Sequence, residues 1–163
     1  MKFVIIGAGP AGVRAAETLR ENDPQATITL VGDEPGEPYA RMAIPYILSG
    51  AIDDAGARQR RSLDHLQALG IRYLHGKALK VQARPDGGQV DLADGTQLPY
   101  DRLLVATGSS PSLPPLTGTG LPGVVTCWTL EDAHRIAAKL TPGARVVMLG
   151  AGFVAGVCMK SLV

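Results

Sequence analysis

The sequence lacks the marks of several protein classes. It has only two cysteines, Cys127 and Cys158, which form no CxxC pair. A secreted domain of this size is usually richer in cysteine, so we expect a reducing, cytoplasmic location. No stretch approaches the roughly 18 apolar residues of a membrane-spanning helix. The formal net charge of +1 creates no strong positive potential that would attract nucleic acid or an anionic membrane surface. We therefore predict neither a membrane span nor a nucleic-acid partner.

Metal ligands and internal repeats are also lacking. The three histidines share no ligand spacing with one another or with the cysteines, so no metal site is predicted. No unit of about 20 to 50 residues recurs. The hydrophobic content of 45% is nevertheless enough for a buried core. A chain of 163 residues is expected to form one domain, or one domain and part of another.

The first 32 residues predict a parallel sheet. Residues 2–6 form an apolar run that enters a glycine turn, which is typical of a buried strand rather than a signal peptide. Residues 10–22 have helical periodicity, and residues 26–32 are rich in β-branched side chains. This order of strand, glycine turn, helix and strand is a βαβ unit.

The middle of the chain predicts a helix, then an antiparallel meander, then a buried strand. A helix is expected over residues 61–70, with Ser62 as a candidate cap and Gly70 as its stop. Residues 72–100 alternate between apolar and polar and contain Asp-Gly and Gly-Gly turns, which predicts an antiparallel meander. The apolar run of residues 102–108 then predicts another buried parallel strand.

The last third of the chain is predicted to begin with a linker. Residues 109–123 are rich in proline and glycine. A helix is expected over residues 129–140, where Thr129 and Asp132 form a partial capping box. Residues 145–150 predict a strand, followed by a second glycine turn and the start of a helix.

The first glycine motif, GAGPAG, predicts a dinucleotide site. Gly7 allows a tight turn off the strand, Gly9 lets the backbone approach a pyrophosphate, and Gly12 lets the helix pack on the sheet. Pro10 and Ala11 complete the turn, at the positive end of the helix where an anion faces unpaired N–H groups.

Acidic and basic residues follow the second strand. Asp33 ends that strand about 20 residues after the motif, where an acceptor for a ribose hydroxyl is needed; its neighbour Glu34 is the alternative. Residues 33–50 contain three prolines and predict a long loop or short helices. Within them, Arg41 can neutralise a pyrophosphate or stack on adenine. The glycine motif and the acid by themselves fit NAD and FAD equally.

A second motif, GAGFVAG, comes near the end of the chain. It contains Gly150 and Gly152, with Ala155 at the third position, where alanine is accepted. The same type of nucleotide-binding turn is therefore predicted twice in one chain.

Together with GAGPAG, the segment YDRLLVATG resembles the two-dinucleotide-binding flavoprotein superfamily of glutathione reductase, the pyridine nucleotide-disulfide oxidoreductases. The loop DEPGEPYARMAIPYILSG is similar to that of the ferredoxin reductase, apoptosis-inducing factor and nitrite reductase large subunit branch, with AIPYILSG closer to the NADH oxidase style. The resemblance implies an α/β, Rossmann-like FAD/NAD(P)-binding fold of three layers: a parallel sheet, helices and an antiparallel meander.

The resemblance also implies ligand contacts. In this branch the acid and the arginine, here Asp33 and Arg41, contact FAD. A backbone amide at Ala78 would contact adenine, and the flavin would be approached by Ala106, Thr107 and Gly108. Tyr46 stands where related reductases usually place a lysine and is a candidate to stack on the flavin. The second motif would hold NAD(P)H, although Val157 stands where related chains commonly carry glutamate.

By resemblance, residues 1–113 would be the first segment of an FAD-binding domain. Residues 114–128 would be a linker, and residues 129–163 the incomplete start of an NAD(P)H-binding domain. We therefore expect a truncated fold, the first part of a longer reductase that is a dimer or a subunit of a complex at full length.

The implied function is that of an FAD-dependent oxidoreductase, passing electrons from NAD(P)H through the flavin to a protein or cofactor acceptor. Disulfide reductases carry cysteines beside the flavin, but this stretch has Met42 and Ala43, which excludes a dithiol relay there. No side chain is needed as an acid, base or nucleophile. The alternatives are a non-catalytic FAD-binding or electron-transfer subunit, and an NAD-only Rossmann enzyme, which the ATG segment and the Asp33/Arg41 pair disfavour.

Overall fold

A computed structural model describes residues 1–60 and 64–162. The chain divides into two compact units, each built from two stretches of sequence. The first unit comprises Met1–Tyr39 and Arg58–Gly108, and the second comprises Ala40–Ala57 and Ser109–Val163. The domain boundaries expected from the sequence stay a prediction.

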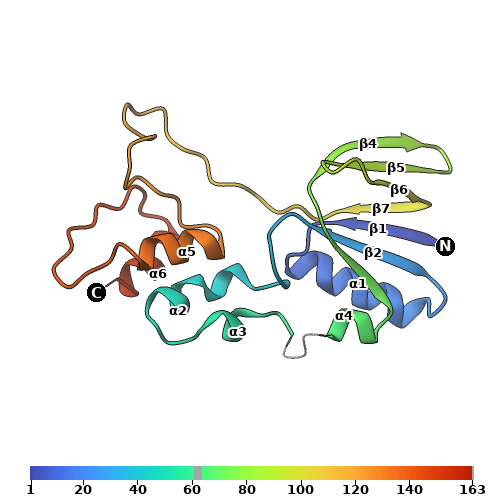
Figure 1. Cartoon of the computed structure of the whole chain (residues 1–163), viewed down its shortest axis with the longest axis horizontal. Coiled ribbons are helices and arrows are strands. Elements are labelled where there is room, and N and C mark those ends of the chain that lie inside the picture. The colour runs from blue at the N-terminus through green and yellow to red at the C-terminus, as the bar shows by residue number, and fades with distance from the viewer. Residues whose placement is uncertain (61–63, 163) are drawn as a thin grey trace. The chain divides into compact units, whose positions relative to one another are not determined.

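The first unit is built on a parallel sheet of four strands in the order β3-β2-β1-β7. Helix α1 (Pro10–Asn22) connects the two central strands, as expected for a βαβ unit (Figure 1). The strands are β1 (Lys2–Ile6), β2 (Thr27–Gly32), β3 (Ile71–His75) and β7 (Arg102–Val105).

An antiparallel sheet forms the third layer of this unit. Its order is β4-β5-β6, the meander that the turn signals predict. The strands are β4 (Ala78–Arg84), β5 (Gly87–Leu92) and β6 (Gln97–Tyr100).

Side chains of β1 serve two cores because successive residues of a strand point to opposite faces. Ile5 packs on the α1 side with Val13, whereas Val4 and Ile6 pack on the meander side with Val90. Each buried side chain of this kind contributes about 1.5 to 3 kcal/mol. The predicted α/β fold of three layers is confirmed.

The helix expected over residues 61–70 is shorter in the structure. Helix α4 spans His65–Ala68. It ends before Gly70, whose φ of +62° is the left-handed conformation expected of a helix stop. The candidate cap Ser62 lies outside the described residues.

The second unit contains short helices. Residues 33–50 were predicted to be a loop or short helices, and their C-terminal part forms the 3-10 turn η1 and helix α2, both in this unit. Residues 109–123 form no helix or strand, as expected of a linker. The capping box is complete, since Thr129 Oγ1 accepts from the Asp132 amide and Asp132 Oδ2 accepts from the Thr129 amide, both at 3.1 Å. The elements are η1 (Arg41–Ala43), α2 (Ile44–Leu48), α3 (Asp54–Ala57), α5 (Leu130–Ala137) and α6 (Phe153–Lys160).

The strand predicted over residues 145–150 is wrong. No strand forms within residues 109–162, so the backbone of this run has no ladder to join. A strand exists only through hydrogen bonds to a neighbour. Val147 and Leu149 are instead 87% and 67% exposed.

Within residues 1–60 and 64–162, no helix is long and apolar enough to cross a membrane.

Candidate functional site

The predicted site segments of the first unit meet at one edge of its parallel sheet. Gly7 follows β1, and its amide donates to Val31 O of β2 at 2.8 Å. Ala106 follows β7, and its amide donates to Ile6 O at 2.7 Å. Asp33 follows β2 at the same edge. Ligands of open α/β sheets bind outside these carboxyl ends of the strands.

The glycine turn and the ATG segment pack backbone against backbone. Gly7 has a φ of +110°, and a Cβ placed on it would lie 2.2 Å from Ala106 O. No other residue type satisfies both conditions. Thr107 and Gly108 lie exposed directly after this contact. The contact between Gly7 and Ala106 joins two motifs that are almost a hundred residues apart in sequence.

Gly12 and Gly9 have different reasons to be glycine. A Cβ on Gly12 would lie 1.8 Å from Gly7 O, so only glycine lets α1 pack this closely on the turn. Gly9 has an extended backbone, with φ of −70° and ψ of 179°, and a Cβ there would meet no protein atom within 4 Å. The protein itself does not require glycine at Gly9, and the space beside it is open.

The start of α1 is equipped to receive an anion. Gly9 is the N-cap, Pro10 occupies the first turn, and neither a capping side chain nor an acidic residue lies in that turn. Backbone N–H groups at a helix start and the positive end of its dipole attract phosphate. Together with the open space at Gly9, this arrangement fits the pyrophosphate of a dinucleotide. Pro10 and Ala11 are exposed beside it.

The two acidic residues after β2 differ in their surroundings. Glu34 is half-buried and accepts a hydrogen bond from the Tyr39 hydroxyl, whereas Asp33 is exposed. This difference favours Asp33 as the ribose acceptor. Ala78 opens β4, two residues after Gly76, whose amide donates to Gly32 O at 2.8 Å.

Arg41 and Tyr46 belong to the second unit. The Arg41 guanidinium carbon lies 5.2 Å from the centroid of the Trp128 ring, a cation–π contact. The Trp128 ring in turn donates to Ser109 O at 3.0 Å. Tyr46 is exposed on α2. The contacts of Arg41 and Tyr46 with a cofactor therefore remain predictions from the resemblance.

The second glycine motif has the same local conformation as the first. Gly150 has a φ of +111°, close to the +110° of Gly7. Gly152 caps α6 with φ of −77° and ψ of 179°, nearly the angles of Gly9. Beyond its chain neighbours, no described atom lies within 4 Å of a Cβ placed on Gly150. Ala155 and Val157 are half-buried in α6.

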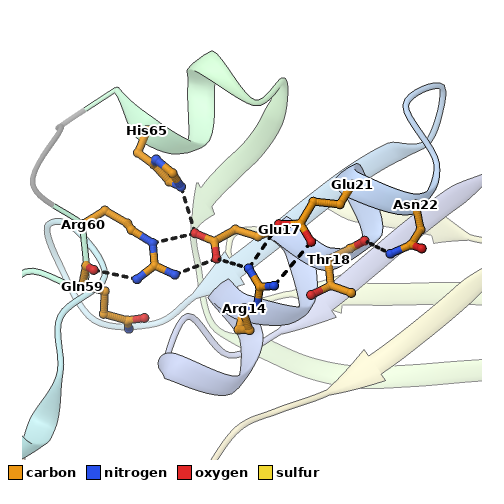
Figure 2. A network of polar contacts seen from close by, with 8 residues as sticks. All are labelled: Arg14, Glu17, Thr18, Glu21, Asn22, Gln59, Arg60 and His65. Carbon is orange, nitrogen blue, oxygen red and sulfur yellow. Dashed lines mark hydrogen bonds and ion pairs between the residues drawn. The ribbon is translucent and has the colours of Figure 1, made fainter.

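A buried charge cluster that was not predicted from the sequence surrounds Glu17 (Figure 2). This residue of α1 is 5% exposed. Arg60 makes a bidentate contact with the Glu17 carboxylate, and its Nε and Nη2 each donate to one oxygen at 2.6 Å. His65 donates through Nε2 at 2.8 Å, and Arg14 lies 3.4 Å away. The ion pair with Arg60 is the main reason why the pKa of Glu17 falls to about 2.

This cluster predicts a loss of stability in acid. The pKa of Glu17 is depressed in the folded state, so its stabilisation is present above its ordinary pKa and is lost as the pH falls through about 2. Between about pH 6 and about pH 3 we expect a loss of about 2 kcal/mol, reduced by solvent screening because Arg60 is partly exposed. Urea unfolding at about pH 6 and about pH 3 measures it. Glu17→Gln, which does not titrate, should show a smaller change; an equal change in both proteins would contradict the prediction.

The two cysteines are close in space. Cys127 Sγ and Cys158 Sγ lie 3.7 Å apart as free thiols. Burial, with a contribution from Cys158, raises the pKa of Cys127 to about 12. A thiol that stays protonated is a poor nucleophile, so Cys127 is suited to packing rather than to reaction. Within the described part of the chain, no three potential ligands cluster as a metal site.

Comparisons with known proteins agree with this geometry. The chain is 36% identical over 154 residues to rhodocoxin reductase of Rhodococcus erythropolis, covering 94% of this chain and 36% of that protein. It is 36% identical over 156 residues to the anthranilate 1,2-dioxygenase system ferredoxin–NAD(+) reductase component of Burkholderia cepacia, covering 93% and 37%. The solved covalent complex of putidaredoxin reductase and putidaredoxin is 30% identical, with a TM-score of 0.87, covering 99% of this chain and 39% of that one.

The chain thus spans little more than a third of the length of these relatives. The profile of the family described as pyridine nucleotide-disulphide oxidoreductase matches residues 1–160. The resemblance inferred from the motifs is confirmed, including the ferredoxin reductase branch. This chain belongs to the pyridine nucleotide-disulphide oxidoreductase family.

Proposed function

We propose that this chain is the N-terminal part of an FAD-dependent oxidoreductase that passes electrons from NAD(P)H, through the flavin, to an acceptor protein. The observation that carries the proposal is the meeting of the glycine turn, Asp33 and the ATG segment at one sheet edge, in a family of reductases. The relatives named as ferredoxin–NAD(+) reductase and as a reductase–putidaredoxin complex support a small redox protein as the acceptor.

The residues present fit FAD at the first motif. The α1 amides and the open side of Gly9 would hold the pyrophosphate, and Asp33 would accept from the ribose. The remaining contacts proposed from the resemblance are Gly7, Pro10, Ala11, Gly12, Glu34, Arg41, Tyr46, Ala78, Ala106, Thr107 and Gly108. When bound, FAD supplies hydride acceptance and the release of electrons one at a time. The protein's role is to orient it and to exclude water.

The second motif would hold NAD(P)H through Gly150, Gly152 and Ala155. Met42 and Ala43 leave no thiol relay at the flavin loop, so the electrons would leave directly for an external acceptor. We further propose a dimer or a subunit of a complex at full length. The low cysteine content supports a cytoplasmic location.

The test is a visible spectrum of the full-length protein before and after NADH is added without oxygen. A bound flavin whose absorption bleaches is the expected result. A bound flavin that does not respond would identify a non-catalytic FAD-binding subunit. Val157 favours this alternative, because the resemblance implies glutamate at its position. A folded protein without flavin would overturn the assignment.

A further inference from the structure

The side chain of Gln59 connects two segments of the proposed FAD site. Its Nε2 donates to Ala8 O at 3.1 Å and to Tyr39 O at 3.0 Å. Its backbone amide also donates to Pro38 O at 3.0 Å. Ala8 lies inside the glycine turn, so one half-buried amide group ties the anion-binding turn to the loop that follows β2.

That loop carries the acidic residues. The Tyr39 hydroxyl donates to Glu34, the neighbour of Asp33. Tyr39 therefore accepts a hydrogen bond from Gln59 through its carbonyl oxygen and donates one to Glu34 through its hydroxyl. Gln59 therefore links the glycine turn to the loop that carries Asp33 and Glu34, in addition to the hydrogen bond from the Gly7 amide to Val31 O.

Gln59 is itself held in place by the Glu17 cluster (Figure 2). Arg60 donates through Nη1 to Gln59 O at 2.7 Å, while the rest of its guanidinium forks onto Glu17. Glu17 lies on α1, the helix that starts at the glycine turn. A planar guanidinium held bidentately is well suited to fix a neighbour's position. The contacts therefore form a closed chain, from α1 through Arg60 and Gln59 back to the turn before α1.

We propose that Gln59 is a positioning residue for FAD, holding the glycine turn and the acidic loop at the separation that the ADP half of the cofactor requires. This inference rests on the proposed function. Preorganised supporting hydrogen bonds raise affinity because the ligand does not have to order the site itself. Gln59 is not a catalytic residue, since it acts through the backbone of the turn and the loop.

The test replaces Gln59 with methionine, which has a similar shape and no donor. Dissociation constants for FAD and for ADP are measured on the full-length protein by fluorescence and calorimetry. The loss of two neutral hydrogen bonds is expected to weaken both ligands about tenfold. Because the contacts of Gln59 lie on the ADP side, kcat at saturating FAD should equal that of the wild type. Arg60→Lys, which keeps the charge but loses the fork, should give a smaller loss of about threefold and serves if Gln59→Met does not fold.

Gln82→Met is the matched control. Gln82 Nε2 donates to Asp91 Oδ2 at 2.8 Å within the meander, so this variant also loses a glutamine hydrogen bond of the same unit. It should leave both dissociation constants unchanged. Equal affinities in the two variants would overturn the proposal, as would a kcat that stays low at saturating FAD. A wild-type protein that binds no FAD would refute the proposed function itself, independently of any variant.

Discussion

A Gly12→Ala variant is expected to lose much of the stability of the first unit. The added Cβ would lie 1.8 Å from Gly7 O and 3.0 Å from Gly7 C. The obstacle is backbone, so helix α1 would have to move away from the sheet whose core it covers. We expect a cost of about 3 kcal/mol or more, a large share of the roughly 5 to 15 kcal/mol that a domain has.

Urea unfolding of the FAD-free protein, followed by circular dichroism, measures this cost. Gly156→Ala is the control, because Gly156 lies inside helix α6 and a Cβ there meets nothing within 4 Å. That variant should keep or slightly raise the stability, since alanine has the higher helix propensity. Unfolding of Gly12→Ala at the urea concentration of the wild type would contradict the packing described for α1.

Replacing Gly9 with valine is expected to have the opposite pattern: the fold stays and the cofactor is lost. The backbone of Gly9 is extended and a Cβ placed on it meets no protein atom within 4 Å, so we expect the fold to accept valine. The side chain would occupy the space in which the pyrophosphate is proposed to approach the α1 amides. Losing those charge-assisted hydrogen bonds should weaken FAD binding about 100-fold.

The measurement is titration of the FAD-free Gly9→Val protein with FAD, alongside its unfolding curve. Gly9→Ala, with a smaller side chain, should show an intermediate loss. An unfolding curve close to that of the wild type, combined with the large loss of affinity, would separate Gly9 from Gly12 as a ligand-facing glycine. Wild-type affinity in Gly9→Val would place the pyrophosphate elsewhere.

Local chemistry explains which elements could be predicted from the sequence. The bounds of β1 and α1 agree with the predictions from periodicity, because an apolar run and a glycine turn define them without help from distant residues. The capping box at Thr129 is likewise a contact within one helical turn. The strand predicted at residues 145–150 fails because pairing is not local: the run is apolar as a strand requires, but residues 109–162 contain no strand with which it could pair.

The features of the site also divide into those that the sequence predicts and those that depend on distant contacts. The sequence by itself determined the family, the glycine turns and their conformation, since the nearly equal backbone angles of Gly7 and Gly150 follow from the same short motif. Packing at Gly12 and ligand approach at Gly9 were predicted from the motif; the tertiary structure added which atoms lie beside each Cβ. It alone revealed Glu17, Arg60 and Gln59 as one connected group. Their contacts span 43 and 51 residues of chain, and no periodicity or spacing in a single sequence encodes which distant side chains will meet.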